Sequence, residues 1–211
     1  MPVNPTHHQF RSSILTAVIN EALEFFCETP LHSLPPPSSF HGVGVYALYY
    51  VGDYAPYEKI AIANKNSYGS VPIYVGKAVP EGWRQGRLQS DSASEKLSLR
   101  LNEHARSIKD GADLAINEFQ CRFIILNGVE SDLISTVESA LIRKFTPLWN
   151  AVVDGFGNHD PGSGRYDQAK SEWDILHPGR TFATRLRGTS APKQQILDKI
   201  ARYSTRAFKP N

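Results

Sequence analysis

The chain has 211 residues, 41% of them hydrophobic and 21% charged, which is enough to bury the core of one domain. Its formal net charge of only +2 gives little overall attraction for a polyanion. No apolar run reaches transmembrane length, and residues 1–10 lack the apolar core of a signal peptide. The two cysteines, Cys27 and Cys121, have no metal-site spacing, so we expect a cytoplasmic protein with reduced thiols and no membrane partner.

The first segment is expected to be a helical arm followed by a stiff linker. Residues 12–27 have helical periodicity, and Ser12 or Ser13 can cap the helix. Its apolar stripe, which predicts packing or a dimer surface, consists of Ile14, Val18, Ala22 and Phe25. Residues 29–39 include three consecutive prolines and cannot be helical, so residues 1–40 are predicted to form an arm and linker.

Three short runs rich in β-branched and aromatic residues predict strands, at 43–51, 71–76 and 119–126. Residues 52–72 are polar and mixed, which predicts an insertion with one short helix between the first two strands. With helices before and after these strands, the expected fold class is α+β, a small central antiparallel sheet of about three strands flanked by helices.

Two strand tyrosines, Tyr46 and Tyr74, each lie close to a glycine, Gly44 and Gly76 respectively. Pairing of the first two strands would bring the tyrosines together, and a glycine inside a strand lets a backbone or ligand approach closely. Strand tyrosines usually serve packing, so the pair gains meaning only from the polar residues that follow it.

A helix is predicted over residues 94–109 and carries Arg100 and His104 one turn apart. The apolar stripe of this helix consists of Leu97, Leu101, Ala105 and Ile108. His104 falls at the edge of that stripe, where a histidine is more often a satisfied core residue than a catalyst. The neighbouring arginine strengthens the functional interpretation.

A second helix is predicted over residues 131–145, with Glu138 in the middle of its apolar stripe. An isolated buried carboxylate is too costly to keep, so Glu138 needs an arginine partner or a metal ion. A structural ion pair is the alternative to a functional acid. Pro147 ends the helix, and Asn150 follows shortly after.

Four further stretches are candidate DNA contacts. Arginine and glutamine can pair with guanine and adenine edges, and the loop at 80–89 combines them as Trp83, Arg84, Gln85, Arg87 and Gln89. Additional candidates in the insertion and in the glycine-rich stretch 154–165 are Lys65, His159 and Arg165. Residues 180–209 carry eight lysines and arginines against one acid, Asp198, which suggests a nucleic-acid surface or simply a solvated one.

Taken together, these segments resemble the GIY-YIG nuclease superfamily over roughly residues 43–150. The matching residues, in chain order, are Gly44-Val45-Tyr46, Tyr74-Val75-Gly76, Lys77-Ala78, Arg100, Glu138 and Asn150. Each motif alone is weak, but their order and their predicted secondary structure make the set specific.

The sequence departs from the general pattern in the insertion at 52–72 and in His104. Both features, with the glycine-rich segment 153–159, resemble the small type II restriction endonucleases of the superfamily. That resemblance implies a homodimer that cuts palindromic double-stranded DNA, and a separate DNA methyltransferase as partner. The most similar members of that group favour a GC-rich six-base site, so CCGCGG is the expected sequence.

The resemblance also implies a reaction, metal-assisted phosphodiester hydrolysis. Glu138 would hold one Mg²⁺, a hard ion that binds through few carboxylates and keeps several waters. Tyr46 would be the general base, with Lys77 favouring its phenolate and His104 accepting or relaying the proton.

Arg100 would meet the charge that develops on the phosphorane. Tyr74 and Asn150 would bind the phosphate or orient its neighbours. The base could instead be Tyr74, since the sequence does not separate the two tyrosines.

We expect a catalytic core over residues 41–165 and a basic extension over 166–211 that belongs to the same globular unit, with short helices at 167–176 and 191–206. One alternative is a structure-specific repair or homing nuclease, although such enzymes usually carry separate targeting domains. Another alternative is a DNA-binding protein without catalysis, which would need no acid at Glu138.

Overall fold

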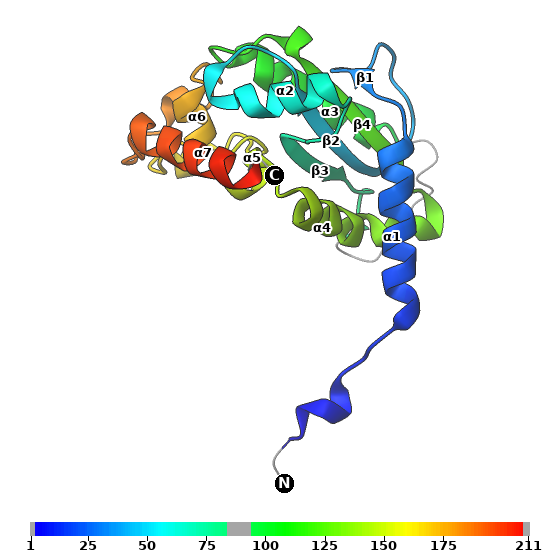
Figure 1. The fold of residues 1–211 in the computed structure, drawn as a ribbon. Coiled ribbons are helices and arrows are strands. Elements are labelled where there is room, and N and C mark those ends of the chain that lie inside the picture. The colour runs from blue at the N-terminus through cyan, green and yellow to red at the C-terminus, as the bar shows by residue number, and fades with distance from the viewer. Residues whose placement is uncertain (1–2, 84–93, 209–211) are drawn as a thin grey trace.

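Alternating and aromatic-rich runs form the strands of an antiparallel sheet, which the computed structural model of the chain shows between layers of helices (Figure 1). The structure describes residues 3–83 and 94–208. Within these residues the sheet has four strands in the order β1-β4-β2-β3. The strands are β1 (His32–Ser33), β2 (Gly44–Tyr50), β3 (Tyr74–Ala78) and β4 (Phe119–Ile125). The predicted α+β class is confirmed.

The helices lie where the sequence predicts them, but the one predicted over 167–176 begins only at Glu172, and a short one at Leu148–Ala151 was not predicted. They are α1 (Ser13–Glu28), α2 (Glu58–Asn66), α3 (Lys96–Asp110), α4 (Ile134–Phe145), α5 (Leu148–Ala151), α6 (Glu172–Leu176) and α7 (Lys193–Ala207). Short 3₁₀ turns lie at Pro5–His8, Ala55–Tyr57, Ile116–Glu118, Gly128–Leu133, Ser163–Arg165 and Ala183–Arg185. The helix predicted to begin at residue 131 begins at Ile134, because a 3₁₀ turn precedes it.

Strand β2 is central, and all seven of its residues are buried. Its side chains alternate between two cores, as the period of two in a strand requires. One face meets α1 and α4 through Val45, Ala47 and Tyr49. The other face meets α3 and the C-terminal half of the chain through Tyr46, Leu48 and Tyr50. The tyrosine of interest therefore lies on the α3 side of the sheet.

The fourth strand, β1, was not predicted and comes from the proline-rich linker. His32 pairs with Cys121 and Ser33 with Gln120. The strand is only two residues long and is followed closely by prolines, which lack the N–H group that a longer ladder needs. The linker thus extends the sheet by one short edge strand.

Helix α1 packs with a different set of residues from the predicted stripe. Leu23 and Phe26 are buried against the sheet and α4, whereas Ile14 and Phe25 are 72% and 60% exposed. The packing prediction is wrong for Ile14, because the first half of α1 extends away from the body of the molecule (Figure 1), and for Phe25, whose side chain is exposed although its neighbour Phe26 is buried. A periodic stripe shows that a helix has an apolar side, but not how far a neighbour covers it.

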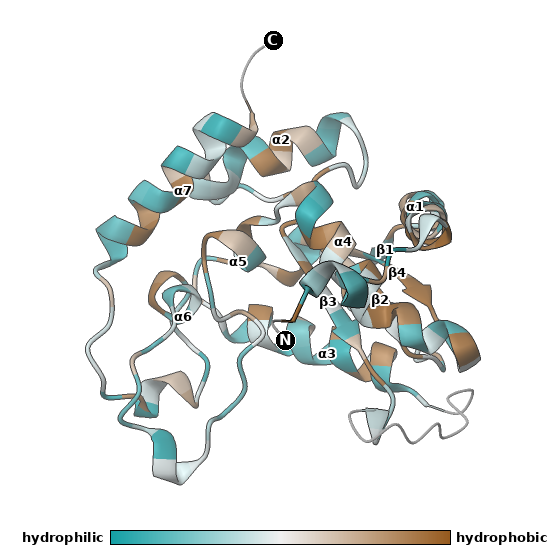
Figure 2. Ribbon diagram, turned by 90° about the horizontal axis from the view of Figure 1, so that it is seen from below, coloured by the Kyte–Doolittle hydropathy of each residue, from teal (hydrophilic) through white to brown (hydrophobic). Residues whose placement is uncertain are grey.

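The insertion at 52–72 contains the predicted short helix, α2, and a buried amide anchors it. The Asn64 side chain donates to the carbonyls of Tyr50 and Val71 and accepts from the Val71 N–H. These bonds join the end of β2 to the approach of β3, so the two strands still pair despite the long connection. Helix α7 packs beside α2 (Figure 2), with Ile196, Ile200 and Tyr203 buried as predicted.

A buried polar cluster ties the C-terminal half to the core. The Tyr57 hydroxyl lies 2.7 Å from His177 Nε2 and accepts from Trp149 Nε1 at 3.1 Å. The other ring nitrogen of His177 lies 3.1 Å from the Ala112 carbonyl. In the parts of the chain covered by residues 3–83 and 94–208, no helix combines the length and apolarity needed to cross a membrane.

Candidate active site

The pairing of β2 with β3 places Tyr46 directly opposite Gly76. A Cβ atom at Gly76 would lie 2.4 Å from the Tyr46 hydroxyl oxygen, so the tyrosine ring can cross the neighbouring strand only because residue 76 is a glycine. Gly44 meets a similar constraint, since a Cβ there would lie 2.1 Å from the Ile124 carbonyl oxygen. Gly76 therefore makes room for the Tyr46 side chain, and Gly44 allows the close approach of β2 to β4.

Tyr46 is hydrogen-bonded to His104. The phenolic oxygen lies 2.6 Å from His104 Nε2, and both side chains are buried. Burial raises the pKa of Tyr46 well above 10, Tyr74 adds to this, and Arg100 opposes it. Burial also lowers the pKa of His104 well below 6.5, with a further contribution from Arg100. At neutral pH both groups are therefore uncharged.

Tyr74 completes an aromatic box around His104. Its ring lies edge-on to His104 at 5.2 Å, and the Phe156 ring stacks on His104 at 4.6 Å. Burial raises the pKa of Tyr74, while Arg100 lowers it. Among the described residues, Tyr74 has no histidine hydrogen-bond partner, which distinguishes it from Tyr46.

Arg100 extends from α3 one turn before His104 and is held by the glycine-rich segment. Its guanidinium donates to Glu103 Oε2 at 2.7 Å and to the Gly157 carbonyl at 3.2 Å. It also contacts His159 Nε2. The side chain is 20% exposed, so it can reach a ligand while its orientation is set by these partners.

Lys77 and Glu138 form an ion pair on the other side of β3. Lys77 lies opposite Val45 in the strand pairing, so its side chain leaves the sheet on the α4 face. Its ammonium lies 2.8 Å from Glu138 Oε2 and donates to Ser135 Oγ at 3.0 Å. Glu138 was expected to have an arginine or metal partner, and the structure shows a lysine instead.

This placement changes the expected role of Lys77 toward Tyr46. The cation that lowers the pKa of Tyr46 is Arg100, which lies on the same face of the sheet. The charge of Glu138 raises the pKa of both tyrosines, although burial is the main cause. The two faces of β3 are therefore electrostatically linked at this edge of the sheet.

Asn150 fastens the edge strand. Its side-chain oxygen accepts from the Val75 N–H and its side-chain nitrogen donates to the Val75 carbonyl, both at 2.8 Å. Val75 separates Tyr74 from Gly76. The amide of Asn150 is thus engaged with the backbone between two motif residues.

Glu138 is compatible with a magnesium ligand. Its side chain is 18% exposed, and the ion pair uses one carboxylate oxygen, while a carboxylate has about four acceptor positions. Across residues 3–83 and 94–208 there is no group of three His, Cys, Asp or Glu that could enclose a metal. Such a lone carboxylate suits Mg²⁺, which relies on water and substrate phosphate for its remaining ligands.

The site opens on a groove of about 430 Å³, which lies between α3 and the loops at residues 156–160 and 180–185. Arg100, His104 and His159 line it together with Arg106 and Arg185. A second hollow of about 250 Å³ continues past Arg100 to Lys77. The two hollows share Arg100 and form a mainly cationic track along α3.

The residues predicted to contact DNA lie in different places. His159 joins the site through Arg100, whereas Arg165 is exposed in a 3₁₀ turn. Lys65 is exposed and paired with Asp53 beside the insertion. Trp83 is half-buried at the end of a described stretch. The other members of that predicted loop lie outside the described residues: Arg84, Gln85, Arg87 and Gln89.

The predicted basic surface at 180–209 is partly neutralised. Arg180 is buried and pairs with Asp174, Arg185 pairs with Asp160, and Lys199 pairs with Glu172. Arg180 was counted among the DNA-facing cations, which is wrong, because its side chain is only 3% exposed. The acids that neutralise these cations precede residue 180, so a charge count along one segment missed them.

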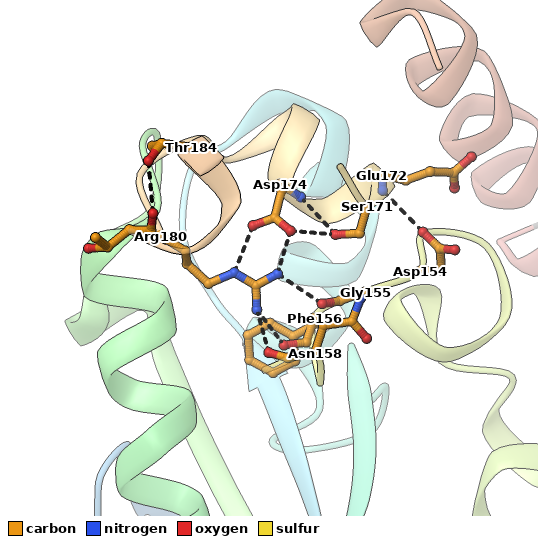
Figure 3. A network of polar contacts seen from close by, with 10 residues as sticks. Asp154, Gly155, Phe156, Asn158, Ser171, Glu172, Asp174, Arg180 and Thr184 are labelled. Carbon is orange, nitrogen blue, oxygen red and sulfur yellow. Dashed lines mark hydrogen bonds and ion pairs between the residues drawn. The ribbon is translucent and has the colours of Figure 1, made fainter. Parts of the chain in front are cut away.

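Figure 3 shows that Arg180 and Asp174 organise the glycine-rich loop. Arg180 donates to the carbonyls of Gly155, Phe156 and Asn158. The sequence analysis did not identify this pair as part of the site. The only sequence signal was the glycine-rich stretch itself, whose free backbone carbonyls need donors from elsewhere in the chain.

Comparison with known proteins gives one family. A family model described as the Eco29kI GIY-YIG domain matches residues 38–204, which is more than half of the chain. The match begins after β1 and ends within α7, so it includes both tyrosines, α3, α4 and the glycine-rich loop. No curated protein matches the chain.

Proposed function

Because the chain belongs to the Eco29kI family of GIY-YIG restriction endonucleases, we propose that it is a type II enzyme cutting both strands of double-stranded DNA at a specific site. Membership makes the chain a nuclease acting on DNA. The observation that carries the finer proposal is the short Tyr46–His104 hydrogen bond beside Arg100, with Glu138 at the same edge of the sheet. These groups supply a base, a cation and a metal ligand.

Tyr46 is the proposed general base. Its pKa is raised by burial, so it carries no useful phenolate population at neutral pH. It can take a proton from the attacking water only by passing its own proton to His104 Nε2, 2.6 Å away. A bound phosphate adds negative charge near His104 and makes the imidazole a better acceptor. Tyr74, which lacks such a partner in the described residues, is the weaker candidate.

Arg100 is proposed to bind the scissile phosphate and stabilise the negative charge of the transition state, where one placed donor contributes roughly 3–4 kcal/mol. Glu138 would hold Mg²⁺, which when bound neutralises phosphate charge and favours water attack. Lys77 directs the Glu138 carboxylate toward the β3 edge through their ion pair. Tyr74 completes the wall around the phosphate, and Asn150 fixes the strand that carries it.

The enzyme is proposed to act as a homodimer on a palindromic site, because two active sites related by a twofold axis can each cut one strand of a twofold-symmetric duplex. We place the interface on the exposed apolar side of α1, where Ile14, Leu15 and Phe25 are uncovered. A GC-rich target such as CCGCGG and a separate methyltransferase that protects it complete the proposal.

The test is incubation of the purified protein with a large, sequenced, unmethylated DNA, with and without Mg²⁺. Glu138→Gln is the test variant and Glu130→Gln, an exposed acid before α4, is its control. Discrete Mg²⁺-dependent fragments that disappear only in Glu138→Gln support the proposal, and their ends give the recognition sequence. A smear or nicking at branched structures indicates a repair-type nuclease. DNA binding without any cleavage contradicts the catalytic proposal.

A further inference from the structure

One buried arginine, Arg180, holds the glycine-rich loop in its shape. Every N–H of the Arg180 guanidinium has an acceptor. Nε and Nη2 donate to the two carboxylate oxygens of Asp174 at 2.7 and 2.8 Å. Nη2 also donates to the Gly155 carbonyl, and Nη1 donates to the carbonyls of Phe156 and Asn158. Three of these five bonds hold carbonyls within the four-residue stretch 155–158, and the other two hold Asp174 (Figure 3).

The surroundings hold Arg180 itself in one orientation. Its guanidinium stacks 4.6 Å from the Trp173 ring and 4.8 Å from the Phe182 ring. Asp174 is anchored in turn by Ser171, whose hydroxyl donates to Oδ2 at 2.7 Å. Both side chains of the ion pair are at most 3% exposed. A buried pair with all its hydrogen-bonding capacity satisfied specifies geometry strongly.

The loop held by Arg180 is the one that holds Arg100. The Gly157 carbonyl accepts from Arg100 Nη2, and His159, two residues on, contacts Nη1. Gly157 lies between Phe156 and Asn158, the two residues whose carbonyls Arg180 binds. A shift of either neighbour therefore moves the acceptor of Arg100.

We propose that Arg180, with Asp174, is a positioning residue that sets the orientation of Arg100 through the backbone of Gly155–Asn158. This inference rests on the proposed function, since it assigns Arg180 a part in placing the phosphate-binding arginine. Arg180 does not touch the substrate. It makes the C-terminal extension a required part of the active site.

The first experiment compares Arg180→Lys with Arg143→Lys, a control at an exposed arginine on α4. Lysine keeps the charge but cannot serve five acceptors in a plane. Misplacement of a catalytic group by about 1 Å costs roughly 100-fold in rate. We expect the single-turnover cleavage rate of Arg180→Lys to fall 10- to 100-fold while its DNA dissociation constant stays within about threefold. A folded variant that cleaves at the wild-type rate overturns the inference.

A double-mutant cycle separates positioning from general stability. If Arg180 acts through Arg100, then Arg180→Lys reduces the cleavage rate by less than threefold when Arg100 is already lysine. Losses that multiply fully contradict the inference. Asp174→Asn, a nearly isosteric change, serves as the second variant if Arg180→Lys does not fold, and the same non-additivity is expected.

A spectroscopic measurement keeps this inference distinct from the proposed function. The side-chain N–H signals of Arg100, assigned through Arg100→Lys, report its hydrogen bonds whether or not the protein cleaves DNA. We expect them to shift and average in Arg180→Lys but not in Arg143→Lys. Failure of the wild type to cleave DNA would contradict the proposed function. Unchanged Arg100 signals in Arg180→Lys would refute the positioning role, whether or not the wild type cleaves DNA.

Discussion

The part of the chain that the structure describes contains two buried tyrosine–histidine hydrogen bonds of nearly equal length, and their surroundings differ. Tyr57 and His177 lie 2.7 Å apart, and each has a second partner, Trp149 and the Ala112 carbonyl. Tyr46 and His104 lie 2.6 Å apart, and His104 lines an open groove. In the described residues no protein group is hydrogen-bonded to the second ring nitrogen of His104. A pair whose hydrogen-bonding groups all have partners can only stabilise the fold. A pair with a free ring nitrogen beside a groove can exchange a proton with a ligand.

The largest expected effect tests the Tyr46–His104 pair, the open pair, which lies beside the groove. Tyr46→Phe removes the hydroxyl that accepts the water proton, so the cleavage rate should fall about 100- to 10,000-fold. The free energy of unfolding should fall by only about 1 kcal/mol, because the phenyl ring keeps the packing and a single buried partner, His104, loses its hydrogen bond. The measurement is single-turnover cleavage of DNA, with Tyr74→Phe beside it. Equal residual activity in the two variants would rule out Tyr46 as the unique base.

The second effect tests the Tyr57–His177 pair, the closed pair, through the pH dependence of stability. Burial lowers the pKa of His177 from 6.5 to about 4, so between these pH values the unfolded chain binds a proton that the folded chain does not. Stability is therefore complete above pH 6.5 and is lost as pH falls toward 4, by about 3 kcal/mol from this group. Urea titrations from pH 7 to 4 measure it, and His177→Gln should flatten the slope. An unchanged slope would show that His177 is not the titrating group.

Tyr57→Phe should reduce the free energy of unfolding by about 2 kcal/mol, because two buried partners lose their hydrogen bond. The cleavage rate of the folded protein should stay within about twofold of the wild type. This result would be the reverse of that for Tyr46→Phe. A large loss of activity without loss of stability would erase the distinction between the two pairs.

The smallest effect concerns the second partner of the closed pair. Trp149→Phe removes one donor to the Tyr57 hydroxyl and leaves the Tyr57–His177 bond intact. We expect a loss of about 1 kcal/mol for the hydrogen bond, in addition to a packing loss for the smaller ring. Chemical denaturation of Trp149→Phe, Tyr57→Phe and the double variant measures the coupling. Full additivity would mean that Trp149 and Tyr57 do not share this bond.

The sequence predicted local features well and long-range partners poorly. Runs rich in β-branched and aromatic residues identified β2 and β3, and the pairing of those strands brought Tyr46 opposite Gly76. Helical spacing placed Arg100 and His104 on one side of α3. These predictions depend on neighbours within a few residues, for which backbone geometry sets the outcome.

Partners distant along the chain could not be predicted in the same way. Glu138 was expected to need an arginine or a metal ion, and its ion-pair partner is Lys77, because the strand register turns that lysine toward α4. Arg180 was assigned to a charged surface, yet Asp174 and three carbonyls enclose it. Tyr57 and His177 are 120 residues apart, and no periodic pattern relates them.

The amide of Asn150 has a consequence for the sheet as a whole. Strand β3 is an edge strand, and exposed edges invite pairing with strands of other molecules. Asn150 occupies the outward N–H and carbonyl of Val75, and the Trp149 N–H occupies the carbonyl of Ile73. A short stretch of side chain and backbone thus imitates a fifth strand where the sheet would otherwise remain open. The residue that steadies the catalytic edge also protects the protein from edge-to-edge aggregation.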